Sequence, residues 1–200
     1  MPSAGAVVRR RVPDGDSATR TTLLDAAEAL LLEEGYAAVT SRRLAAKAGT
    51  NPALLYYYFA NMDDLFVALF RRGSERSFGR LKQALDSPQP LWAMWGLIHD
   101  YSSTALTMEF MALANHRKVI RAEIAAASKR FRQLQLKSLT RVLEGYGVDA
   151  GEWPPVSIII LMSGVSRFML IEEEFGVRTG HTETIALVER HIEALEGPRC

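Results

Sequence analysis

Apolar residues recur at helical spacing along almost the whole chain, and this periodicity limits the fold more than any other feature. In the first such stretch, Leu23, Ala27, Leu30 and Leu31 follow the i, i+4, i+7, i+8 spacing of a helix with one buried face. No stretch alternates apolar and polar residues as a half-buried strand does. The sequence therefore predicts an all-α protein.

Glycine and proline divide the helical pattern into segments. Residues 1–16 are expected to form a flexible basic tail, and residues 17–62 a compact domain of three short helices. Residues 63–200 are expected to form a larger helical domain, whose first helix, 63–85, connects it to the small one. Further helices are expected at about 91–106, 108–115, 118–146, 153–175 and 182–195.

Composition is that of a folded globular chain, with 48% hydrophobic and 24% charged residues. Cys200 is the only cysteine, which excludes an intrachain disulfide and a cysteine-based metal cluster. The uncharged apolar stretch at residues 153–166 is too short to span a bilayer, and no secretory signal is visible. We therefore expect a soluble cytoplasmic protein without membrane contact.

Charge is spread unevenly over the two halves of the chain. Residues 1–85 hold 12 basic and 9 acidic residues, whereas residues 86–200 hold 12 and 14. This mild asymmetry permits a nucleic-acid-binding N-terminal half but does not establish one.

Two short helical patterns, residues 41–48 and 52–58, flank a tight turn at Gly49-Thr50. Thr40 and Asn51 are good N-cap residues, and Pro52 fits a first helical turn. This layout is typical of a helix-turn-helix, in which the second helix enters the DNA major groove.

The outer face of that second helix offers chemistry suited to DNA. Ala53 and Leu54 are suited to thymine methyl groups, and the hydroxyl of Tyr57 to phosphate oxygens. Of the three successive tyrosines, Tyr56 is expected to pack inward. The alternative is that the two helices are simply packed helices of a core.

The run at residues 40–59 is TSRRLAAKAGTNPALLYYYF. It resembles the helix-turn-helix of the TetR/AcrR family of bacterial transcriptional regulators nearly throughout. Gly35-Tyr36 and Asp64-Leu65 also fall where that family places Gly-Tyr/Phe and an acidic-Leu pair. The resemblance covers about residues 18–70 and implies a helix-turn-helix head followed by a helical ligand-binding and dimerisation domain.

The resemblance implies that a group of residues around the turn contacts DNA. They are Thr40, Ser41, Arg42, Thr50, Asn51, Pro52, Ala53, Leu54, Tyr56 and Tyr57. Met62 departs from the family's frequent Lys at the start of the fourth helix, which predicts weaker and less salt-dependent binding. Arg9, Arg10 and Arg11 are interpreted as a solvated tail, with a minor-groove arm as the alternative.

A three-helix head reads few base pairs, so a homodimer on a palindromic operator is expected. Residues 156–166 are apolar on nearly all sides and need burial all round. Together with the last helix they predict a four-helix dimer interface through Ile158, Leu161, Met162, Val165, Leu187, Ile192 and Leu195. The alternative is that the apolar helix is only the central core of the monomer.

A small apolar or amphipathic effector is expected to bind between residues 91 and 146, with Arg167 as a further contact. The candidate lining residues are Trp92, Trp95, His99, Phe110, Met111, His116 and Arg167. Each of the apolar ones fits an ordinary core equally well. No cofactor, metal site or catalytic residue is predicted.

The most favoured function is a dimeric, sequence-specific DNA-binding regulator, a repressor released by a small-molecule effector. The rival readings are a helical enzyme, or a protein-interaction adaptor that keeps the head only as a fold. The sequence has no Gly-rich phosphate loop and no paired histidines at ligand spacing, and their absence argues against an enzyme.

Overall fold

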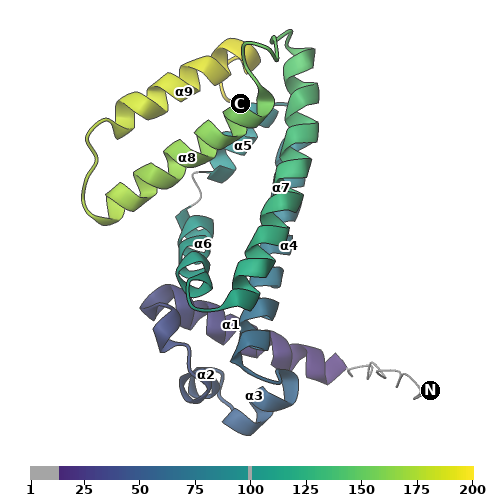
Figure 1. The fold of residues 1–200 in the computed structure, drawn as a ribbon, viewed down its shortest axis with the longest axis vertical. Helices are drawn as coiled ribbons and strands as arrows, with labels where there is room; N and C mark the ends of the chain where they lie inside the picture. Colours follow the sequence, from purple (N-terminus) through teal and green to yellow (C-terminus); the bar gives the residue numbers. More distant parts are fainter. Residues whose placement is uncertain (1–13, 99–100) are drawn as a thin grey trace, which may run out of the picture. The chain divides into compact units, whose positions relative to one another are not determined.

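The computed structural model describes residues 14–98 and 101–200, and within these ranges all regular structure is helical. The predicted all-α class is confirmed (Figure 1). The elements are α1 (Asp14–Glu34), η1 (Tyr36–Ala38), α2 (Ser41–Lys47), α3 (Pro52–Tyr58), α4 (Met62–Leu85), α5 (Pro90–Ile98), α6 (Tyr101–Ala114), α7 (Lys118–Gly145), α8 (Pro155–Glu174) and α9 (His181–Glu196).

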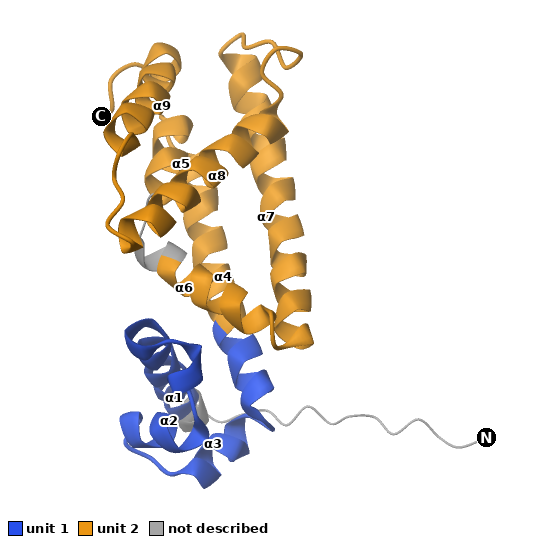
Figure 2. Ribbon diagram, turned by 60° about the vertical axis from the view of Figure 1, so that its left-hand side comes forward, with its two compact units in different colours: residues 1–69 blue, residues 70–200 orange. Residues whose placement is uncertain are grey.

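The chain divides into two compact units, residues 1–69 and residues 70–200 (Figure 2). The division falls inside α4, which is one continuous helix. Asp63 and Asp64 stand in the first turn of α4, where carboxylates interact favourably with the positive helix end. Asn61 accepts a hydrogen bond from the backbone N–H of Asp64 at 2.9 Å and caps the helix.

The first unit is built on the apolar face of α1. Leu23, Ala27 and Leu31 are fully buried there, as their spacing predicts. Leu44 of α2 and Leu55 of α3 complete the core and are equally buried, at 0% and 1% exposure. A core of this size fixes α2 and α3 against α1, so the outer faces of the two short helices are left for other contacts.

The start of α1 differs from the prediction. The helix begins at Asp14, so residues 14–16 belong to it and not to the tail. Arg9, Arg10 and Arg11 lie outside the described residues.

The second unit has a core around α5. Trp92 and Trp95 pack there with residues of α7, α8 and α9, including Leu139, Ile159 and Ile192. The N–H of the Trp92 indole donates to the Gly197 carbonyl at 2.9 Å. Both backbone N–H groups at the start of α5, those of Leu91 and Trp92, donate to the Glu196 carboxylate at 2.8 and 3.0 Å. The end of α9 is thereby held against the start of α5.

Tyr146 joins the same cluster from the end of α7. Its hydroxyl donates to Glu196 Oε1 at 2.8 Å. Burial, and then the hydrogen bond and negative charge of Glu196, raise the pKa of Tyr146 to about 12. The phenol therefore stays protonated at physiological pH.

One predicted helix boundary is wrong. The sequence suggested that one helix ends at about residue 106 and the next begins at 108, whereas α6 is continuous from Tyr101 to Ala114. Residues 99 and 100, between α5 and α6, lie outside the described residues. The buried hydroxyl of Ser166 in α8 donates to the Ile98 carbonyl at 2.9 Å. This long-range contact joins α8 to the last described turn of α5.

Helices α4 and α7 run in the same direction through the second unit. Arg71 pairs with Glu123 at 2.6 Å, and further along both helices the rings of Phe78 and Phe131 meet edge to face at 5.5 Å. Arg130 also pairs with a carboxylate of α4. The hydrogen bond from Arg71 lowers the pKa of the Glu123 carboxyl, against the opposing effect of burial. These contacts join two long helices along their length.

Candidate nucleic-acid interface

The α2–turn–α3 segment is fixed by its own caps. The Thr40 hydroxyl accepts from the backbone N–H of Arg43 at 3.4 Å, and Asn51 Oδ1 accepts from that of Leu54 at 2.9 Å. Between the helices Gly49 adopts a φ of 66°, a conformation that glycine takes at little cost. The Thr50 N–H then returns to the Ala45 carbonyl at 2.8 Å. Local sequence alone thus produces the tight turn between the two helices.

Helix α3 has a buried side and an open side. Leu55 points into the core, and Phe59 directly after the helix is also buried. On the open side Tyr57 is 66% exposed and Tyr56 48% exposed. The prediction that Tyr56 packs inward is therefore wrong; Tyr58, three residues after Leu55 and on its side of the helix, is the partly buried tyrosine.

The structure brings the predicted DNA-contacting residues together on one stretch of unit 1. All ten lie at the start of α2, in the turn or on α3. The exposed members are Thr40, Arg42, Asn51, Pro52, Ala53, Tyr56 and Tyr57, and the partly buried ones are Ser41, Thr50 and Leu54. Their contact with DNA stays a prediction.

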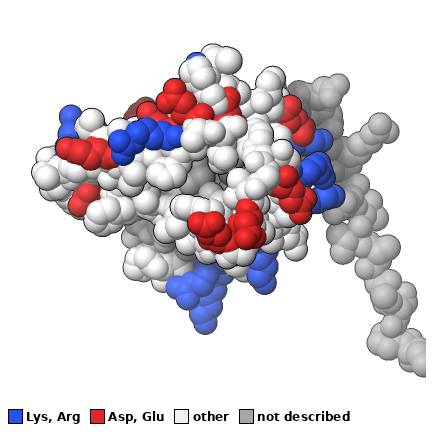
Figure 3. Space-filling view, turned by 90° about the horizontal axis from the view of Figure 1, so that it is seen from above, with Lys and Arg blue, Asp and Glu red and all other residues white. Residues whose placement is uncertain are grey.

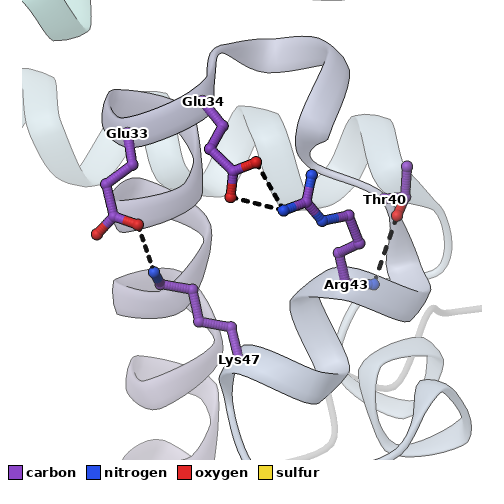
Figure 4. A network of polar contacts seen from close by, with 5 residues as sticks. All are labelled: Glu33, Glu34, Thr40, Arg43 and Lys47. Atoms are coloured by element: carbon purple, nitrogen blue, oxygen red, sulfur yellow. Dashed lines mark hydrogen bonds and ion pairs between the residues drawn. The ribbon is translucent and has the colours of Figure 1, made fainter.

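Two basic residues of α2 are held by acidic residues of α1 (Figure 4). Arg43 Nη2 donates to both carboxylate oxygens of Glu34, at 2.6 and 2.7 Å, and Lys47 Nζ donates to Glu33 at 2.6 Å. These pairs tie α2 to α1. The sequence reasoning missed them, because the partners are 9 and 14 residues apart and no local spacing rule joins them.

The head carries little positive charge of its own. Residues 14–69 contain four basic residues, Arg20, Arg42, Arg43 and Lys47, against eight acidic ones. Arg20 stacks on the Phe59 ring at 5.2 Å, while Arg43 and Lys47 are paired. Within the described part of the head, Arg42 is the exposed cation that makes neither an ion pair nor a ring contact.

The predicted interface residues of α8 and α9 divide into two groups. Met162 and Ile192 are buried in the core of unit 2, and Ile158 packs against that core. Leu161, Leu187 and Leu195 are exposed, at 60%, 49% and 37%, and Val165 is half-buried. The helix is therefore not enclosed within the monomer.

Further large apolar side chains of α8 are open to solvent. Ile160 is 53% and Phe168 61% exposed. Among the described residues, α8 is also the helix that is long and apolar enough to cross a membrane, a property that core helices of soluble proteins share.

In the view of Figure 3, acidic and basic side chains lie in small groups with uncharged surface between them.

The predicted effector residues do not surround one cavity. Trp92 and Trp95 belong to the core, Phe110 is buried against Phe70 with ring centroids 5.1 Å apart, and His99 lies outside the described residues. The remaining three, Met111, His116 and Arg167, are exposed. Their role in effector binding stays a prediction.

A cavity of about 140 Å³ lies elsewhere in unit 2, between α4, α5 and α7. Its lining residues are Ser77, Arg80, Leu81, Met94, Leu97, Ile98, Phe131 and Gln135. None of them was predicted, because the residues come from three distant segments and each fits an ordinary core.

Comparison with known proteins agrees with this architecture. Residues 23–69 match the model of the bacterial regulatory proteins of the tetR family. No curated protein matches the chain.

Solved structures show the same fold over most of the chain. A putative transcriptional regulator from Pseudomonas aeruginosa PAO1 is 18% identical, with a TM-score of 0.67 over 94% of this chain and 95% of its own. One from Saccharomonospora viridis, in complex with choline, is 18% identical, with a TM-score of 0.69 over 89% and 95%. A TetR transcription regulator from Haloarcula marismortui is also 18% identical, with a TM-score of 0.67 over 90% and 98%. Residues 23–69 are therefore a TetR-family helix-turn-helix domain, and the chain has the fold of a TetR-family transcriptional regulator.

Proposed function

We propose that this protein is a dimeric, sequence-specific DNA-binding repressor that a small-molecule effector releases from its operator. The observation that carries the proposal is the capped α2–turn–α3 segment with an open outer face on α3. In a helix-turn-helix the first helix crosses the DNA backbone while the second lies in the major groove. Such a protein acts in the cytoplasm, where a bacterial chromosome is accessible.

The exposed tyrosines supply contacts to the DNA backbone. Tyr56 and Tyr57 carry exposed hydroxyl-bearing side chains on the C-terminal half of α3, and hydroxyls donate well to phosphate oxygens. Arg42 at the start of α2 adds a positive charge. These groups position the head on the duplex without depending on its sequence.

Dimerisation through α8 and α9 accounts for the exposed apolar side chains there. Leu161, Phe168 and Leu187 are each about half exposed or more in the isolated chain. Exposed apolar surface of this kind marks interaction sites in soluble proteins. A two-fold axis through this surface buries the same residues from both protomers and places two heads on one operator.

The cavity between α4, α5 and α7 is the best candidate for the effector site. Choline in the Saccharomonospora viridis regulator supports the idea that proteins of this fold bind small molecules. A ligand changes operator affinity only by as much as it distinguishes the bound and free states. Helix α4 contributes to the cavity and also contains residues of the head, so it offers a direct route for that coupling.

The test is operator binding by variants of Tyr57, measured by fluorescence anisotropy on a duplex selected from random DNA. Tyr57→Phe removes one hydroxyl and Tyr57→Ala the whole side chain; we expect about a five- to tenfold loss of affinity for the first and more for the second. Tyr146→Phe, the same chemical change in unit 2, is the matched control and should bind like the unmodified protein. Equal affinity of all four proteins would refute the role of Tyr57.

A further inference from the structure

The N-terminal part of α3 presents apolar groups where a recognition helix contacts bases. In a helix-turn-helix, base edges are read by residues at the start of the second helix. Here those residues are Pro52, Ala53 and Leu54. Pro52 and Ala53 are exposed and Leu54 is half-buried, and none has a hydrogen-bonding side chain.

Three polar side chains near α3, those of Asn51, Arg43 and Lys47, make hydrogen bonds within the head. Asparagine reads adenine with both its amide oxygen and its amide nitrogen, but Asn51 Oδ1 accepts from the backbone N–H of Leu54 at 2.9 Å. This cap fixes the Asn51 amide at the helix start and uses one of the two acceptor positions of its oxygen. Arg43 and Lys47, the other long donors of the segment, are bound to Glu34 and Glu33.

The lack of charged side chains on α3 also favours apolar contacts with the bases. Helix α3 has no ionisable group other than its tyrosines, and those occupy its C-terminal half. Arg42 lies on α2, the helix that crosses the phosphate backbone in this motif. A bidentate arginine contact to guanine, the commonest specific contact in the major groove, thus has no donor at the start of α3.

We infer that this head recognises its operator through the 5-methyl groups of thymine, which Ala53 and Leu54 contact in the major groove. The inference rests on the proposed DNA-binding function and specifies the chemistry that α3 reads. The major groove displays the thymine methyl as its one apolar feature, and alanine and other apolar side chains pack against it. Burial of one methyl group against such a side chain changes affinity about fourfold.

The experiment replaces thymine by deoxyuridine in a selected operator, one position at a time. This change removes the methyl and leaves base pairing and every hydrogen-bonding group of the groove intact. At each thymine opposite α3 we expect the dissociation constant to rise about fourfold, and about fifteenfold when both half-sites are changed together. A 5-methylcytosine·guanine pair at the same position should recover part of the loss relative to cytosine·guanine.

A protein variant links the methyl effect to the helix. Leu54→Ala should lose affinity for the thymine operator and distinguish thymine from deoxyuridine by less than twofold at one position. Leu32→Ala is the matched control, because Leu32 is an exposed leucine of α1, 43% accessible and outside the helix pair. It should keep the fourfold difference.

Two results would overturn the inference in different ways. If the unmodified protein binds the fully deoxyuridine-substituted half-sites within twofold of the thymine operator, the bases are read by hydrogen bonds, with Arg42 the first candidate. If no duplex is enriched or bound at any salt concentration, the DNA-binding function itself fails. Because the deoxyuridine series uses the unmodified protein, it decides the matter even if Leu54→Ala does not fold.

Discussion

Truncation of Leu161 should weaken the proposed dimer strongly while leaving the protomer folded. The side chain lies on α8 and is 60% exposed in the isolated chain. Leu161→Ala removes three carbon atoms. Transfer of these atoms from full exposure to full burial contributes about 2.4 kcal/mol of favourable free energy. Since about 60% of the side chain remains to be buried, association loses about 1.4 kcal/mol per protomer.

Two-fold symmetry doubles this loss to about 3 kcal/mol, which corresponds to about a hundredfold larger dissociation constant. Sedimentation velocity over a range of protein concentrations measures it directly. Leu32→Ala, an equal truncation on α1 with 43% exposure, should leave the dimer constant unchanged. An unchanged constant for Leu161→Ala would refute the placement of the interface, and a monomeric unmodified protein at high concentration would refute the dimer.

Two further predictions concern charge. Arg42→Ala should reduce the slope of log affinity against log salt concentration by about 0.9 per head, or about 1.8 per dimer. Arg43→Ala should leave this slope unchanged, because Arg43 is paired with Glu34. Anisotropy titrations at several salt concentrations measure both slopes. Glu123→Gln should lower the free energy of unfolding by less than about 1 kcal/mol near pH 6, because the partner Arg71 is 64% exposed. Since the pKa of Glu123 is lowered in the folded state, its contribution is present above the ordinary glutamate value of about 4.3 and disappears as the pH falls through the lowered pKa. Urea unfolding between pH 6 and pH 3 should therefore show the difference between the two proteins closing, and a constant difference would contradict the ion-pair explanation.

Local signals predicted the helix pair well. Thr40, Gly49 and Asn51 act through hydrogen bonds and backbone conformations that span only a few residues, so their types and spacing were sufficient. Tyr56 was placed on the wrong side because three consecutive tyrosines carry no contrast in polarity. Leu55 fixes the buried side of α3 and would have identified Tyr58 as the inward tyrosine.

Contacts between distant segments could not be predicted from the sequence. The Ser166 hydroxyl donates to the Ile98 carbonyl, and the two residues are 68 positions apart in the sequence. Trp92 and Trp95, three residues apart, both pack into one core cluster, but helical periodicity does not say whether such a face meets a core or a cavity. Arg167, a candidate effector contact, has an exposed side chain on α8.

The central claim is that two copies of the head read one DNA site, and selection of duplexes from a random pool tests it most directly. Purified protein at a stated salt concentration is incubated with the pool, and bound duplexes are amplified and sequenced. The account predicts enrichment of a palindrome with thymine-containing half-sites about 34 Å apart, one turn of the double helix or a multiple of it. Enrichment of no sequence at any salt concentration, or of a single half-site without its symmetric copy, would contradict it.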